Sequence, residues 1–283
     1  MKVILLGTGG PKPDPNRQGP CLAVQVNRTN LLFDAGRGAA TQLVRAGISV
    51  RDVGSVFITH HHFDHIGNLG DIILSGWNLG REGTLSIYGP EGTEVIVDVL
   101  LNKVYKKDIV FRQEEAHVSG VALADIKKIA NTKDVVPGLV LADKGIKVYC
   151  QFVEHGHGLG ISQAGWKCLA YRIEANGKSV TISGDAVDCQ GLDVLAKNTD
   201  ALVMCCYLSK KEMMDKEGDL TGNHILACSP QAGKIAAKAK AKKLILTHIR
   251  EKSSELMKDL VDEICADYQG EIITGADLME IRV

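Results

Sequence analysis

The sequence has little aromatic content, few prolines and no excess of charge of either sign. Aromatic residues make up 5% of its 283 positions, 7 residues are proline, and 33 basic residues stand against 34 acidic ones. Near-neutral charge gives no overall positive field that would gather nucleic acid or an anionic membrane. The opening MKVILLGTGG has too short an apolar run for a secretory signal or a membrane span. These absences predict a cytoplasmic protein with no membrane partner.

The sequence also lacks paired cysteine motifs. Its eight cysteines are scattered, and none stands in a C-x-x-C pair. That spacing argues against a zinc ribbon and against a dithiol redox motif. Scattered cysteines are typical of buried thiols in a reducing compartment, which agrees with a cytoplasmic location.

Strand-like and helix-like segments alternate along the chain. Short β-branched runs end in Gly, Asp or His, and segments with apolar residues at helical spacing separate them. The expected strands cover residues 2–7, 21–26, 30–36, 55–60, 85–90, 146–156, 168–173, 179–185, 201–207, 243–249 and 278–283. The expected helices cover residues 40–47, 93–105, 229–241 and 253–268, the last two with Ser229 and Ser253 as N-caps.

The chain shows no interdomain linker and no strict repeat. A weak echo between FITH at Phe57 and LILTH at Leu244 indicates two similar halves within one domain, residues 1–283. The segment 102–145 is the least strand-like part of the chain. We expect it to form a cap or lid.

One stretch, FITHHHFDHIGN at residues 57–68, contains four of the nine histidines. An apolar strand ending near Thr59 would place the side chains that follow in a loop at the sheet edge. His60, His62, Asp64 and His65 offer nitrogen and oxygen ligands of the kind that zinc and similar cations bind. The spacing H-x-H-x-D-H therefore predicts a metal site.

Three later strands each deliver one further ligand candidate. FVEHGHG supplies His155, TISGDAVD supplies Asp185 and LILTHI supplies His248. In each case an apolar run ends at the candidate, so the strand ends could bring these side chains to the same sheet rim. The set is large enough for two metal ions.

These motifs, with GTGGP, FDAGRG, YGPEGT and NHILACSPQAG, resemble the metallo-β-lactamase-fold hydrolases, and in particular the branch of ribonuclease Z and the ribonuclease-Z-like arylsulfatases. The resemblance covers nearly the whole chain. It implies an α+β fold, a four-layer αβ/βα sandwich with two β-sheets face to face and helices outside. It also implies that His60, His62 and His155 bind one metal ion, that Asp64, His65 and His248 bind the other, and that Asp185 bridges them.

The resemblance implies a dinuclear metal-dependent hydrolase whose nucleophile is a hydroxide held between the metal ions. Two cations lower the pKa of bound water and stabilise the charge that builds on the substrate oxygen. Asp64 would also orient that water or accept its proton. Zn is the first expectation for the two divalent ions, although Mn or Fe could use the same ligands. Dimers are common for this fold, so we expect a homodimer.

Other residues are weaker candidates. His224, in NHILACSPQAG, falls where the ribonuclease-Z-like branch has a histidine that assists the leaving group, so we expect a catalytic role for it. His157 and His117 could reach the pocket only if their segments turn toward it. We expect Asp34 to brace a turn, Thr59 to hold the ligand loop by a hydrogen bond, and His61 to be a neighbour of the ligands.

Two departures from ribonuclease Z make RNA a less favoured substrate. Only residues 156–184 separate His155 from Asp185, where ribonuclease Z carries a long arm for tRNA, and Cys205 and Cys206 stand near the position of the family's glutamate. We therefore expect a small-molecule substrate, a sulfate or phosphate ester or a similarly activated compound. The alternatives are RNA 3′-processing, hydrolytic dehalogenation, lactone or thioester hydrolysis, and a non-catalytic metal-dependent sensor.

Overall fold

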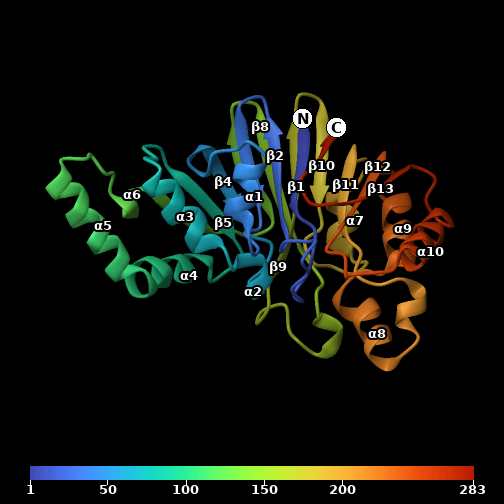
Figure 1. Ribbon diagram of the computed structural model, residues 1–283. Helices are drawn as coiled ribbons and strands as arrows, with labels where there is room; N and C mark the ends of the chain where they lie inside the picture. The colour runs from blue at the N-terminus through green and yellow to red at the C-terminus, as the bar shows by residue number, and fades with distance from the viewer.

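A computed structural model describes all residues, 1–283. Its centre consists of two seven-stranded mixed β-sheets that lie face to face, with helices on the outer face of each (Figure 1). The first sheet has the order β14 (Met279–Arg282), β1 (Lys2–Gly7), β2 (Cys21–Val26), β3 (Thr29–Phe33), β4 (Val53–Phe57), β5 (Leu85–Gly89) and β6 (Ala130–Asp134). The second has the order β13 (Glu271–Thr274), β12 (Lys243–Thr247), β11 (Ala201–Cys205), β10 (Lys178–Ile182), β9 (Cys168–Ala175), β8 (Ile146–Val153) and β7 (Gly138–Asp143). The predicted α+β sandwich is confirmed.

The helices divide between the two outer layers. The first half contributes α1 (Ala39–Arg45), α2 (Phe63–Ile66), α3 (Leu69–Asn78), α4 (Thr93–Val99), α5 (Lys106–Ser119) and α6 (Ile126–Ile129). The second contributes α7 (Gln190–Leu195), α8 (Lys216–Leu220), α9 (Ser229–Lys238) and α10 (Ser254–Cys265). In Figure 1, α5 lies at one end of the molecule and α9 and α10 lie at the other. None of these helices combines the length and the apolar character needed to cross a membrane, and the cytoplasmic location stays a prediction.

The interface between the two sheets is apolar and contains a cluster of aromatic rings. Phe33 and Phe57 of the first sheet stack with ring centroids 4.8 Å apart, and Tyr171 of the second sheet lies edge-on to Phe57 at 5.4 Å. The Tyr171 hydroxyl donates a hydrogen bond of 2.8 Å to the carbonyl oxygen of Ile58. This bond joins β9 to the segment that leads from β4 into the ligand loop, so the central core helps to position that loop.

All eleven predicted strands are present, but three strands were missed, namely β6, β7 and β13. β6 and β7 lie within the segment 102–145, so this segment contains more strand than expected, and its role as a cap or lid stays a prediction. The two strands form the far edge of the first and the second sheet, respectively. Their sequences, ANTKD and GLVLAD, have only partly buried or exposed side chains, so they lack the apolar run that marked the other strands.

The predicted serine caps have different outcomes. Ser253 does cap α10, where its hydroxyl oxygen accepts a hydrogen bond from the backbone N–H of Leu256. Ser229 does not cap α9, because Cys228 holds the cap position and Ser229 is the first helical residue, followed by Pro230 in the first turn. The Ser229 hydroxyl donates instead to Glu263 on α10. Ser229 therefore links α9 to α10 and does not cap the start of α9.

Candidate metal centre

The seven predicted ligand side chains lie together, beyond the C-terminal ends of four strands. The loop after β4 carries His60 and His62, and the short helix α2 that follows carries Asp64 and His65, which were expected in the loop; His155 follows β8, Asp185 follows β10 and His248 follows β12. All of them except His62 are buried. Since β4 belongs to the first sheet and the other three strands to the second, the centre lies at the edge where the two sheets meet.

The seven side chains form two groups. In one group, ligand atoms of His60, His62, His155 and Asp185 all lie within 4.8 Å of one another, and in the other the same holds for Asp64, His65 and His248. The grouping of the six outer residues is the one that the resemblance implies. Their role as metal ligands stays a prediction, which the chemistry of the atoms supports.

Asp185 lies between the two groups. Its Oδ2 atom is 3.3 Å from Nε2 of His248 and 3.4 Å from Nε2 of His65, in the second group. The same atom is 3.8 Å from Nε2 of His60 and 3.9 Å from Nε2 of His155, in the first group. A carboxylate at this point could contact an ion in either group, which is the position that a bridging ligand requires.

The hydrogen bonding of these groups is incomplete without a cation. Asp64 Oδ2, His65 Nε2 and His248 Nε2 are buried and have no hydrogen-bond partner within the protein. Buried polar atoms usually have partners, and unpaired ones call for an explanation. Because all three atoms converge in one group of nitrogen and oxygen donors, a divalent cation fits the site.

The electrostatics of the site favour a positive charge. Burial and the neighbouring His155 lower the pKa of His62 to about 4, so its imidazole is neutral and has a free lone pair near pH 7. Burial alone would raise the pKa of Asp185, but His248 and His65 hold it well below its ordinary value. Burial would likewise lower the pKa of His65, yet Asp185 and Asp34 raise it well above its usual range. Positive charge is therefore favoured between these carboxylates.

A set of hydrogen bonds orients the ligand rings. Asp34 Oδ2 accepts from Nδ1 of His65 at 2.8 Å, and its two oxygens also accept from the hydroxyl and the backbone N–H of Thr59. His155 Nδ1 donates to the carbonyl oxygen of Ile225 at 2.6 Å. In both histidines the bond to Nδ1 leaves Nε2 free to face the centre. Asp34 therefore does more than brace a turn, which is the role that the sequence predicted for it.

His248 is held by close packing. Its backbone has a left-handed conformation, with φ of 52°, and its ring lies against Gly10. A Cβ atom at Gly10 would come within 2.8 Å of Cε1 of His248. The loop GTGG therefore needs a glycine here because of the approach of a metal-ligand candidate.

Two histidines near the ligands serve other contacts. His61 makes a 2.8 Å hydrogen bond through Nε2 with the Thr93 hydroxyl, outside both groups, as predicted for a neighbour. His157 Nδ1 accepts from the backbone N–H of His155, and its Nε2 donates to the carbonyl oxygen of Trp166. His157 therefore holds the loop that follows β8. His117 lies exposed on α5 and belongs to neither group.

His224 lies next to the loop after His155 rather than among the ligands. It is exposed, it occupies the π-helical turn Thr221–Ile225, and its carbonyl oxygen accepts from the N–H of Gly156 at 2.7 Å. Cys205 and Cys206, where a glutamate was expected, are buried in the core of the second half. His224 therefore has no acidic partner from that strand.

Two aromatic residues at the centre were missed from the sequence. The Trp166 ring lies 4.8 Å from that of His62, and the Tyr207 ring lies 5.7 Å from that of His248. Trp166 lies in the loop after His155, but no spacing in the sequence relates it to His62, which its ring contacts. Tyr207 could have been found, since it closes the run ALVMCCY that reaches the same sheet edge.

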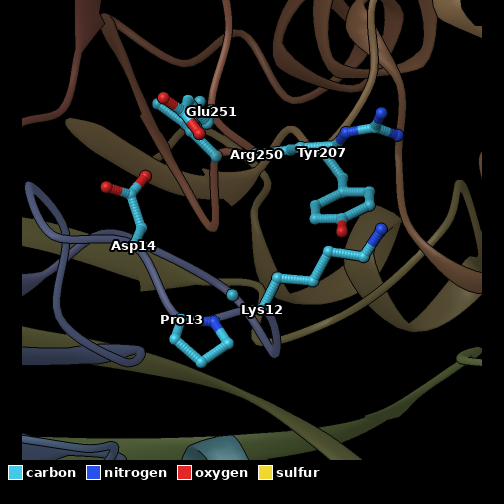
Figure 2. Close-up of a pocket in the computed structure, with 8 residues that line it drawn as sticks. Lys12, Pro13, Asp14, Tyr207, Arg250 and Glu251 are labelled. Atoms are coloured by element: carbon cyan, nitrogen blue, oxygen red, sulfur yellow. The ribbon is translucent and has the colours of Figure 1, made fainter.

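A cavity of about 320 Å³ opens beside His248 (Figure 2). Its lining residues are Gly10, Lys12, Pro13, Asp14, Tyr207, Ile249, Arg250 and Glu251. In Figure 2 the basic ends of Lys12 and Arg250 lie on the side of the Tyr207 ring, and the carboxylates of Asp14 and Glu251 lie on the opposite side. The cavity is therefore polar, with both signs of charge.

The chain is similar to proteins of known family along most of its length. The family model described as "Beta-lactamase superfamily domain" matches residues 29–249. A protein named Ribonuclease Z from Mycolicibacterium gilvum is 31% identical over 254 residues, which cover 88% of this chain and 84% of that protein. Another Ribonuclease Z, from Mycobacterium bovis, is 28% identical over 100% of this chain and 98% of its own length.

Solved structures agree on the fold. The metallo-β-lactamase-fold protein YhfI from Bacillus subtilis has a TM-score of 0.74 and 19% identity, with 99% of this chain and 98% of that chain covered. The short form of human tRNase Z has a TM-score of 0.69 and 22% identity, with 100% and 99% covered. The chain therefore belongs to the beta-lactamase superfamily as a metal-dependent hydrolase of the metallo-β-lactamase fold, in the branch that contains Ribonuclease Z.

Proposed function

We propose that the protein hydrolyses phosphodiester bonds, and that RNA with a 3′ extension is the first substrate to test. The observation that carries the proposal is the pair of ligand groups that share Asp185, together with the 31% identity to a Ribonuclease Z over most of both chains. These two observations favour a nucleic-acid substrate over the small-molecule substrate expected from the sequence. A small-molecule ester is the second candidate substrate.

Two divalent cations would be held by the two groups, with Asp185 between them. When bound, such ions activate water for attack, polarise the bond to be cleaved and neutralise charge on the phosphoryl oxygens. The nitrogen-rich donor set favours zinc, with manganese or iron as the other candidates. The homodimer also remains a proposal.

The chain's own residues would supply proton transfer and orientation. Although burial would raise the pKa of Asp64, the nearby imidazoles of His248, 3.5 Å away, and His65 lower it. Asp64 therefore stays ionised near pH 7 and is proposed to accept the proton of the attacking water. Asp34, Thr59 and Ile225 keep the histidine rings oriented while this happens.

His224 is proposed to donate a proton to the leaving group. Its exposed position beside the loop after His155 leaves the imidazole accessible to a substrate that reaches the centre. His224→Ala should keep both metal ions by elemental analysis but turn over about 100-fold more slowly on esters with poor leaving groups. Equal slowing across a series of leaving groups would remove His224 from the mechanism.

The short connection between His155 and Asp185 favours the second candidate function. Residues 156–184 contain a single 3₁₀ turn, a loop, β9 and β10, so no arm projects there for a large RNA. The mixed charges of the cavity beside His248 also give no continuous basic surface. A small phosphate or sulfate ester would need neither feature.

The two candidates are separated by a substrate panel. The metal-loaded protein should be tested on an aryl phosphodiester, an aryl sulfate, a lactone, a chlorinated aromatic and a tRNA precursor with a 3′ trailer. Cleavage of the precursor at one position supports RNA processing, whereas turnover of the aryl phosphodiester without RNA cleavage supports a small-molecule phosphodiesterase. If neither phosphodiester reacts, the proposed function is wrong. A His60→Ala, Asp185→Ala double variant is the control for contaminating nucleases.

A further inference from the structure

The metal centre is open to solvent on one side, at His62. The other three members of its group, His60, His155 and Asp185, are buried, whereas His62 is exposed. A substrate atom that approaches the first group must therefore pass His62. The residues around His62 form the entrance on that side.

Trp166 lies at this entrance. Its ring centroid is 4.8 Å from that of His62, with 42° between the ring planes, and 5.9 Å from that of His60. Its side chain is only partly buried. The second tryptophan, Trp77, is by contrast fully buried and donates from its indole nitrogen to the carbonyl oxygen of Ala124. Trp166 is thus placed differently from an ordinary core tryptophan.

The backbone around Trp166 is fixed by several contacts. The Trp166 carbonyl oxygen accepts from His157 Nε2 at 2.8 Å, and its N–H donates to the carbonyl oxygen of Ser162 at 3.0 Å. The next residue, Lys167, forms an ion pair with Glu91 at the start of the segment that leads into α4. These contacts hold the indole against His62, and its partly buried side chain also packs against the core of the second half.

Neighbouring residues of the same loop add apolar surface. Leu159 and Ile161 are 41% and 45% exposed, respectively. Leu159 and Ile161 belong to the same loop as Trp166, and exposed apolar side chains near a polar site are typical of a surface that a ligand covers. The loop therefore offers an aromatic face and apolar contacts beside a metal centre whose other walls are polar.

We propose that Trp166 is a substrate-positioning residue, whose indole packs against a ring of the substrate next to the bond to be cleaved. The inference rests on the proposed function and specifies the class of substrate, namely esters that carry a nucleobase or an aryl group on the His62 side. Aromatic side chains bind bases by stacking without selecting their sequence, because every base has a π-face. A ring held there would bring the adjoining phosphate to the ligand groups.

Binding can be tested without turnover. The chain has two tryptophans, so the fluorescence of the wild type minus that of Trp166→Phe reports on Trp166. In the metal-loaded protein, adenosine monophosphate should quench this difference signal, whereas ribose 5-phosphate, which lacks the ring, should not. The same response to both ligands, or to neither, would overturn the inference.

Kinetics give an independent readout. Trp166→Ala should raise KM for an aryl phosphodiester about fivefold or more, change KM for a dialkyl phosphodiester little, and leave the metal content unchanged. Trp166→Phe should restore most of the aryl preference, which a purely structural role would not predict. Phe111→Ala, at an aromatic residue 70% exposed on α5, is the matched control.

The two proposals can fail separately. If the wild type cleaves no ester but the fluorescence difference appears, the proposed reaction fails while the binding role of Trp166 stands. If the wild type cleaves aryl esters and Trp166→Ala keeps the same KM, only the binding role fails.

Discussion

At the scale of single residues, the ligand candidates at the ends of predicted strands correctly indicated where the candidate metal centre lies. His60, His155, Asp185 and His248 each lie shortly after an apolar strand, and the other three ligand candidates continue the motif that begins at His60, so this local pattern predicted where the seven side chains meet. What this pattern could not find are contacts that depend on the packing of distant segments. Trp166 near His62 and Asp34 beneath His65 are examples, because no spacing in the sequence relates either pair.

Asp34→Asn tests the support beneath His65. Asparagine keeps the size of the side chain and tolerates the left-handed backbone of residue 34, whose φ is 57°. It removes the negative charge that His65 Nδ1 faces, so metal affinity should fall about 10- to 100-fold. Metal content after dialysis against a weak chelator measures this loss.

Asp52→Asn is the matched control, because Asp52 is a surface carboxylate paired only with Arg51. It should retain metal like the wild type. Retention of both metals by Asp34→Asn under the same dialysis would show that Asp34 does not support the ligand.

At the scale of elements, buried strands were predicted well and edge strands poorly. A buried strand has a continuous apolar run, whereas β6 and β7 are largely exposed and lie at sheet edges, where polar side chains are tolerated. The predicted helices α1, α4, α9 and α10 are present, whereas α3 was missed although its apolar face is buried in the core of the first half. The exposed helix α5 was also missed, because it has no apolar stripe that would mark it in the sequence.

A buried ion pair joins two elements near the centre. Lys252 Nζ lies 2.5 Å from Glu212 Oε2 and 2.8 Å from the carbonyl oxygen of Tyr207, and its side chain is fully buried. Burial alone would raise the pKa of Glu212, but hydrogen bonds from Lys252 and from Ser209 lower it below its ordinary value of 4.5. The pair thus connects the segment after β12 to the loop that carries Tyr207.

This pair predicts a pH dependence of stability. The folded pKa of Glu212 is lower than its unfolded pKa, so its ionised form stabilises the protein above about pH 4.5 and this contribution is lost as the pH falls through the folded pKa. Glu212→Gln should therefore lower the melting temperature at pH 7 and narrow its difference from the wild type in acid. Thermal unfolding at several pH values measures both effects.

Asp259→Asn provides the comparison, since Asp259 pairs with a largely exposed lysine, Lys211, also at 2.5 Å. An exposed pair contributes little, so this variant should unfold near the wild-type temperature at each pH. A constant gap between Glu212→Gln and the wild type from neutral to acid pH would contradict the assignment.

At the scale of the whole molecule, the sandwich was predictable and the substrate was not. The four-layer sandwich was predicted from the family resemblance, and the two strand-rich halves of the sequence are consistent with it. The substrate depends on the shape and charge of the entrance, which loops such as residues 156–166 determine. Their sequence carries no periodicity from which a conformation could be predicted.

Tyr171→Phe tests how much the hydrogen bond between Tyr171 of the second sheet and the Ile58 carbonyl contributes to stability. It keeps the ring among Phe33 and Phe57 but removes the donor to the Ile58 carbonyl, which leaves a buried acceptor unpaired and costs about 1–3 kcal/mol. The melting temperature should fall by roughly 2–4 °C for each kcal/mol. Tyr88→Phe is the control, since Tyr88 also stacks on Phe57 but its hydroxyl has no hydrogen bond to another protein group. An equal shift in both variants would mean that the Tyr171 bond contributes nothing specific.

The place of β14 bears on how the protein is made. Residues 279–282 pair with β1, residues 2–7, so the first sheet contains the first and the last strand of the sequence. During synthesis, β1 therefore leaves the ribosome long before its neighbour exists, and one of its edges stays unpaired over the translation of nearly the whole chain. The first sheet cannot be completed before residues 279–282 have been synthesised, and until then the open edge of β1 can pair with another nascent chain.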